Sequence, residues 1–120
     1  MTANPAPVVL VAHDRLMPGA SLANRLRELG YAPRVVGALG ELPAAAREPG
    51  PLFALVDLEW DAGDVMLALR GLRAEAATAH LPVLAFAGQP EESVREAALA
   101  AGATLVAAGD AVGRQLPQLI

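Results

Sequence analysis

The sequence predicts one α/β domain built from five successive βα units. Short apolar runs alternate with longer segments of helical period, a pattern typical of a parallel sheet covered by helices. The chain has 120 residues, enough for one domain with its own hydrophobic core. No internal repeat or interdomain linker interrupts it, so we expect residues 1–120 to form a single domain.

The expected strands are short runs of apolar and β-branched residues. The run LFALV is expected at the centre of the sheet, and the run APRVVG at its periphery. The five expected strands are residues 8–12, 32–37, 52–56, 81–87 and 103–108.

The first helix is expected after the turn HDRLMPG. Leu22, Leu26 and Leu29 recur there at helical spacing, and Gly30 suits a helix end. A second, alanine-rich helix is expected over residues 41–48.

Acidic residues mark the start of two later helices. We expect Asp61 to cap the third helix and Asp64 to lie in its first turn. Its inward stripe is expected to be Val65, Leu69, Leu72 and Ala76. Pro90, Glu91 and Glu92 suit the first turn of the fourth helix, which runs through Val94, Ala98 and Ala101 to Gly102. Val112, Leu116 and Ile120 predict a short fifth helix.

Composition excludes several classes of function. The chain has no cysteine, two scattered histidines and a net charge of −4, which argues against disulfides, a structural metal site and direct nucleic-acid binding. No apolar run is long enough to span a membrane, and the N-terminus lacks the features of a secretory signal. We therefore expect a cytoplasmic protein without membrane contacts, and the helix arginines at 25, 27, 70, 73 and 95 are expected to point outward.

Asp57 is the leading site candidate. It closes the apolar run LFALVD, and α/β folds usually place their chemistry where parallel strands end. It could instead be a structural carboxylate that accepts hydrogen bonds from the following turn. Trp60 could pack over this edge or anchor an interface.

The ordered segments VLVAHD, ALVDLEW, LPVLAFAG and AALAAGATLVAAGD resemble the receiver domain of response regulators in two-component systems. The resemblance covers nearly the whole chain and implies a flavodoxin-like sheet with strand order 2-1-3-4-5. It also implies a role in signal transduction or a phosphorelay, with a histidine kinase or downstream signalling protein as partner.

In the family, an aspartate after the third strand receives a phosphoryl group beside Mg²⁺. Asp57 matches this phosphoacceptor and Asp14 matches one metal-binding acid, whereas His13 replaces the other acid. Glu59 would lend a backbone carbonyl to the metal. Mg²⁺ is thus left open as a cofactor.

Other family positions have lost their functional groups. Ala87 replaces the hydroxyl residue, Gly109 replaces the lysine, and Val106 replaces the aromatic switch residue. All nine cationic residues are arginine, so no lysine elsewhere can substitute. These departures predict a degenerate receiver, because phosphoryl transfer depends on donors and cations around the transferred group.

Three functions remain open. The leading hypothesis is a non-enzymatic receiver module that binds another protein, with phosphorylation at Asp57 absent or not required. The alternatives are a working phosphoacceptor that uses Mg²⁺, and a flavodoxin-like domain that binds a small ligand or nucleotide in a pocket at the carboxyl ends of the strands. A partner, or a second copy in a homodimer, is expected to contact Trp60, Val94, Ala98, Val106, Val112 and Leu116.

Overall fold

The structure, a computed structural model, describes residues 7–13, 16–47, 51–60 and 64–108. These residues contain five parallel strands in the order β2-β1-β3-β4-β5, which confirms the predicted α/β fold and strand order. The strands are β1 (Val8–Ala12), β2 (Ala32–Val36), β3 (Pro51–Asp57), β4 (Val83–Ala87) and β5 (Leu105–Ala108).

Four α-helices and one 3₁₀ turn connect the described strands. The fifth expected helix, with Val112, Leu116 and Ile120, lies outside the described residues. The helical elements are α1 (Leu16–Glu28), the turn η1 (Leu39–Glu41), α2 (Leu42–Arg47), α3 (Val65–Ala74) and α4 (Glu92–Ala101).

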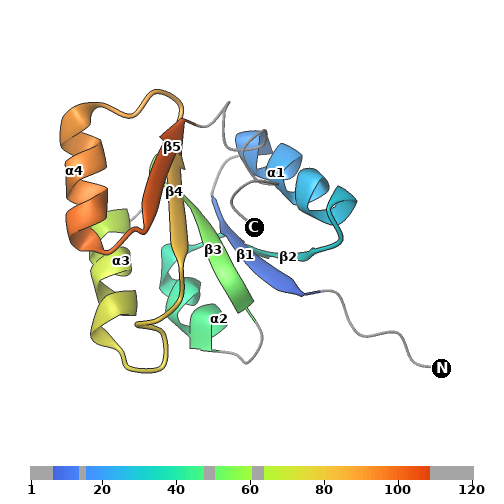
Figure 1. Ribbon diagram of the computed structural model, residues 1–120, viewed down its shortest axis with the longest axis horizontal. Helices are drawn as coiled ribbons and strands as arrows, with labels where there is room; N and C mark the ends of the chain where they lie inside the picture. The colour runs from blue at the N-terminus through green and yellow to red at the C-terminus, as the bar shows by residue number, and fades with distance from the viewer. Residues whose placement is uncertain (1–6, 14–15, 48–50, 61–63, 109–120) are drawn as a thin grey trace.

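The sheet separates two layers of helices, with α1 on one face and α2, α3 and α4 on the other (Figure 1). Successive side chains of a strand point to opposite faces of its sheet. In β3, Leu55 therefore packs in the cluster that contains Leu22 and Leu26 of α1, whereas Val56 packs in the cluster on the other face. Each strand of the interior contributes to both cores, which explains why these strands are apolar runs without alternation.

Helix α1 begins earlier than the sequence indicates. It starts at Leu16, inside the segment that we expected to be a turn. Pro18 is compatible with this start because the first N–H groups of a helix have no intrahelical acceptor, so a proline there removes no helical hydrogen bond. Gly30 follows the helix with a φ of 93°, consistent with the expected helix end.

The start of α3 also differs from the expectation. Asp64 is the N-cap: its Oδ1 accepts hydrogen bonds from the N–H groups of Met66 at 3.1 Å and Leu67 at 3.2 Å. The assignment of the cap to Asp61 is therefore wrong, and Asp61 itself lies outside the described residues. Ala76 is exposed beyond the helix end at Ala74, so it does not continue the inward stripe.

Two arginines expected to point outward instead bind backbone carbonyls. Arg73 of α3 donates to the carbonyl oxygens of Gly102 at 2.7 Å, Ala79 at 2.8 Å and Leu81 at 2.6 Å. Arg95 of α4 donates to that of Val106 at 2.8 Å. These long side chains hold α3 and α4 to the segments around β4 and β5.

Across the described parts of the chain, no helix has both the length and the apolar character needed to cross a membrane.

Candidate functional site at the carboxyl end of β3

Asp57 is a fully buried carboxylate at the end of a central strand. It is the last residue of β3, lies opposite Phe86 of β4 and has 0% of its surface exposed. Its Oδ1 accepts a hydrogen bond from the backbone N–H of Glu59 at 2.8 Å. This contact fits the structural interpretation of Asp57, since the carboxylate closes the turn that follows its own strand.

Glu59 connects this turn to the next loop of the same sheet edge. Its side-chain Oε2 accepts a hydrogen bond from the backbone N–H of Gly88 at 3.0 Å. Gly88 directly follows Ala87, the last residue of β4. The family resemblance implies only a backbone role for Glu59, and no local pattern in the sequence signals this side-chain contact.

Ala87, which stands where receiver domains carry a hydroxyl residue, is apolar and buried at the end of β4. The residue is 6% exposed, and a methyl group cannot donate a hydrogen bond to a phosphoryl oxygen as a hydroxyl group does. On the adjacent strand β5, Val106 is half-buried and packs against the core on the side of α2, α3 and α4. Gly109, which stands where receiver domains have a lysine, lies outside the described residues.

The metal ligands expected after β1 are only partly described. His13 is half-buried beyond the end of β1, and its backbone N–H donates to the carbonyl oxygen of Val36 at 3.1 Å. Asp14 lies outside the described residues. Within residues 7–13, 16–47, 51–60 and 64–108, no three histidine, aspartate or glutamate side chains form a group that could hold a metal ion. Asp57 fits a carboxylate ligand of Mg²⁺, but the described residues alone do not complete a coordination shell.

Trp60 packs inward from the loop after β3. The side chain is half-buried against the core cluster that lies between the sheet and helices α2, α3 and α4. Its Nε1 is buried and has no hydrogen-bond partner among the described residues. Of the two interpretations of Trp60, packing over this end of the sheet fits these contacts.

The expected interface residues do not all lie at the surface. Val94 is half-buried on α4, whereas Ala98 is 0% exposed and belongs to the core. Ala98 is thereby corrected from an interface position to a packing position, because it lies on the face of α4 that covers the sheet. Val112 and Leu116 lie outside the described residues.

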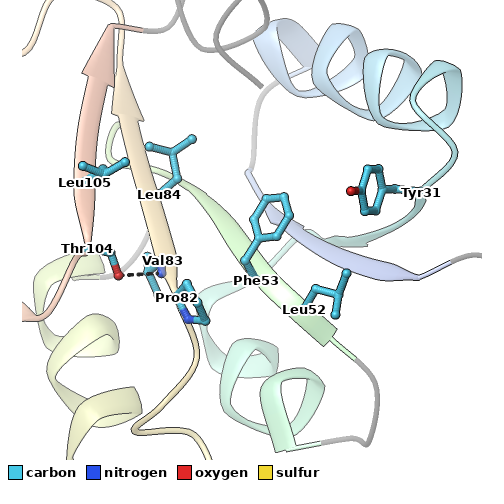
Figure 2. A pocket seen from close by; sticks show the side chains of 8 residues that line it. All are labelled: Tyr31, Leu52, Phe53, Pro82, Val83, Leu84, Thr104 and Leu105. Carbon is cyan, nitrogen blue, oxygen red and sulfur yellow. Dashed lines mark hydrogen bonds between the residues drawn. The ribbon is translucent and has the colours of Figure 1, made fainter. Parts of the chain in front are cut away.

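An apolar pocket of about 270 Å³ lies at the opposite edge of the sheet. Figure 2 shows side chains that line this pocket: Phe53 on β3, Leu84 on β4 and Leu105 on β5, with Tyr31 across from them. The pocket is therefore at the amino ends of these strands and does not include Asp57. The hypothesis of a small-ligand site predicted a pocket at the carboxyl ends, so this pocket does not support it. The lining residues are Tyr31, Leu52, Phe53, Pro82, Val83, Leu84, Thr104 and Leu105.

No protein-family model and no curated protein matches the sequence. Solved structures do match the fold. A candidate response regulator from Chloroflexus aurantiacus has a TM-score of 0.86 and 22% identity, over 95% of this chain and 93% of that one. The receiver domain of the Pseudomonas aeruginosa sensor histidine kinase PA1611 has a TM-score of 0.85 and 22% identity, with the same coverage of 95% and 93%.

Two further observations bear on these matches. The chemotaxis response regulator CheY4 of Vibrio cholerae has a TM-score of 0.82 and 15% identity, over 96% of this chain and 99% of that one. The PA1611 receiver domain holds a magnesium ion in its active-site cleft. This observation is consistent with Mg²⁺ as the cofactor that the sequence left open. The fold of this chain is that of the response regulator receiver domains.

Proposed function

We propose that this chain is a receiver-like module that acts in signal transduction by binding another protein, with phosphorylation at Asp57 absent or not required. The observation that carries the proposal is that a fully buried Asp57 ends β3 while Ala87, the last residue of the neighbouring strand β4, carries only a methyl group. The receiver fold supports the signalling role, and the side chains at its carboxyl edge argue for signalling without a phosphoryl switch.

The reason to propose signalling without a phosphoryl switch is electrostatic. A phosphoryl group carries about −1.5 to −2 charges near neutral pH and needs hydrogen donors or cations around it. Losing one preorganised donor commonly costs about 3–4 kcal/mol of transition-state stabilisation. Ala87 supplies no donor, and the sequence contains no lysine that could replace the missing one.

The proposal makes the chain a binding protein rather than an enzyme. Its partner is a signalling protein, either a histidine kinase or a downstream component, and a second copy of the chain is the alternative partner. A cytoplasmic location is proposed with it.

The proposal is tested by affinity capture with the immobilised chain, with and without a small phosphodonor such as acetyl phosphate plus Mg²⁺. We expect the wild-type chain and Asp57→Asn to retain the same partner to the same extent under both conditions. Retention that requires the phosphodonor and is lost in Asp57→Asn would overturn the proposal.

A working phosphoacceptor is the second candidate, favoured by the position of Asp57 at the carboxyl end of β3. In that reaction a carboxylate oxygen of Asp57 forms a bond to phosphorus while the bond from phosphorus to the donor's leaving group breaks. Asp14, Asp57 and the Glu59 backbone carbonyl would hold Mg²⁺, which offsets negative charge on the phosphoryl oxygens when bound. Intact mass measurement would reveal an adduct about 80 Da heavier that is absent in Asp57→Ala.

A further inference from the structure

The side chain of Glu59 bridges two loops that the chain connects only through α3 and β4. Its backbone N–H donates to Asp57 at 2.8 Å, and its carboxylate accepts from the N–H of Gly88 at 3.0 Å. One residue therefore contacts both the buried acid at the end of β3 and the first amide beyond β4. This contact spans 29 positions of sequence, so it is tertiary structure and no part of a local turn.

A backbone N–H at this edge is a natural donor to an anion. Donors to charged acceptors form stronger hydrogen bonds than donors to neutral ones, and backbone amides need no side chain to supply them. At the end of β4, Ala87 offers no side-chain donor, which leaves the amide of Gly88 as the donor of that loop nearest to the strand end. The carboxylate of Glu59 already accepts the hydrogen bond of this amide.

The contact leaves little room for a second anion at the same amide. A carboxylate and a phosphoryl oxygen would compete for one hydrogen, and two anions side by side repel each other. A Cβ placed on Gly88 would lie 3.6 Å from Oε2 of Glu59, an ordinary contact distance, so the carboxylate rests directly against this residue. An external anion has to displace Glu59 before it can use the amide.

We propose that Glu59 is a built-in anion, whose carboxylate fixes the loop after β4 to the turn after β3 and keeps external anions away from the Gly88 amide. The inference rests on the proposed function and deepens it, because it gives a physical reason why the loops are held together without phosphorylation. Glu59 acts as a positioning residue here, since it orders the two loops and takes no part in a bond-forming step.

The first test is amide hydrogen exchange at Gly88, followed by NMR in the complete chain. We expect Glu59→Ala to exchange this amide at least ten times faster than the wild type. Glu59→Gln should give an intermediate rate, because its side-chain oxygen accepts a hydrogen bond but carries no charge. The matched control is Glu96→Ala on the exposed side of α4, which should leave the Gly88 rate unchanged.

Equal Gly88 exchange rates in the wild type and in Glu59→Ala would overturn the proposal. Because Glu59 is exposed, both variants should fold, and the amide spectrum of the remaining residues verifies this. If Glu59→Ala does not fold, an unchanged Gly88 rate in the folded Glu59→Gln variant would equally overturn it.

The second test uses inorganic phosphate as the probe of anion exclusion. We expect millimolar phosphate to shift the Gly88 amide resonance in Glu59→Ala at concentrations that leave the wild type unchanged. An equal response in the two proteins, or no response in either, would overturn the exclusion. Neither test involves the partner or phosphorylation of Asp57, so their failure is distinct from failure of the proposed function.

Discussion

The guanidinium group of Arg73 donates a hydrogen bond from Nη1 to the backbone carbonyl oxygen of Leu81, with 2.6 Å between the two atoms. The same side chain also donates to the carbonyl oxygens of Ala79 and Gly102. Arg73 thus joins α3 to the segments that lead into β4 and β5. Because a charged donor to several carbonyls stabilises more than a neutral one, this side chain is a major tertiary contact at the amino edge of the sheet.

Replacement of Arg73 by alanine should lower the free energy of unfolding by about 2–3 kcal/mol, since several carbonyl groups lose a charged donor. Chemical denaturation in urea measures this change. Arg70→Ala is the matched control on the same helix, where the arginine is exposed, and should change stability by no more than about 0.5 kcal/mol. Equal losses in the two variants would contradict the role of Arg73.

Three glycine-to-alanine substitutions should separate backbone strain from steric overlap. Gly102 has a φ of 119°, and an added Cβ would overlap Cγ of Arg73, so Gly102→Ala should be the most destabilising of the three. Gly30 has a φ of 93° with open space around it and should cost about 1 kcal/mol from strain alone. Gly71 is helical in open space, so Gly71→Ala should stabilise by about 0.5–1 kcal/mol.

A thermal or urea unfolding series measures this order. The control is Gly102→Ala in an Arg73→Ala background, where the overlap is gone and only the strain of the positive φ remains. A Gly102→Ala cost that is the same in both backgrounds would contradict the assigned overlap.

The two capped helices should respond differently to loss of an acid. Asp64→Ala removes the acceptor for two N–H groups of α3 and should destabilise by about 1 kcal/mol. Glu91 occupies the N-cap of α4 without a side-chain hydrogen bond, so Glu91→Ala should cost less, and Glu91→Ser should stabilise the helix. Urea midpoints of the three variants provide the comparison. A Glu91→Ala loss as large as that of Asp64→Ala would show that the helix dipole, rather than the cap, dominates at both ends.

If Asp57 is a working phosphoacceptor, the second candidate function, then introducing a hydroxyl group at position 87 should raise the rate of its phosphorylation. Ala87→Ser adds a donor to the strand beside the acid, and one such donor commonly changes a rate by about a hundredfold or more. Adduct formation from acetyl phosphate and Mg²⁺, followed by intact mass, measures the rate. Asp57→Ala combined with Ala87→Ser is the control and should form no adduct. An unchanged rate in Ala87→Ser would mean that the missing hydroxyl is not what limits the reaction.

Much of the fold could be predicted because buried strands are short continuous apolar runs, whereas the helices repeat apolar residues every three or four positions. The apolar runs around Val11, Leu55 and Leu84 predicted buried strands, and all three residues lie in the core. The stripe of Val65, Leu69 and Leu72 likewise faces the core as expected. The cap of α3 was misplaced because Asp61 and Asp64 are chemically equivalent, and only the backbone geometry identifies the residue that precedes the first helical turn.

The candidate site was less predictable, because it depends on contacts between distant parts of the chain. The position of Asp57 follows from its place at the end of an apolar run. The hydrogen bond from the Gly88 amide to the Glu59 carboxylate does not follow from any local pattern in the sequence, and neither do the hydrogen bonds of Arg73. An arginine on a helix has the same sequence signature whether it is solvated or bound to carbonyls. Only the tertiary structure brings the carbonyls of Leu81 and Gly102, in the segments before β4 and β5, to Arg73.

The hydrogen bond between Glu59 and Gly88 has a consequence for association. A protein that binds across both loops would otherwise have to immobilise two separate segments, which lowers affinity through lost conformational entropy. With the loops already joined, that entropy is lost during folding rather than during complex formation. A protein that binds there would meet two loops that are already held together in the free chain.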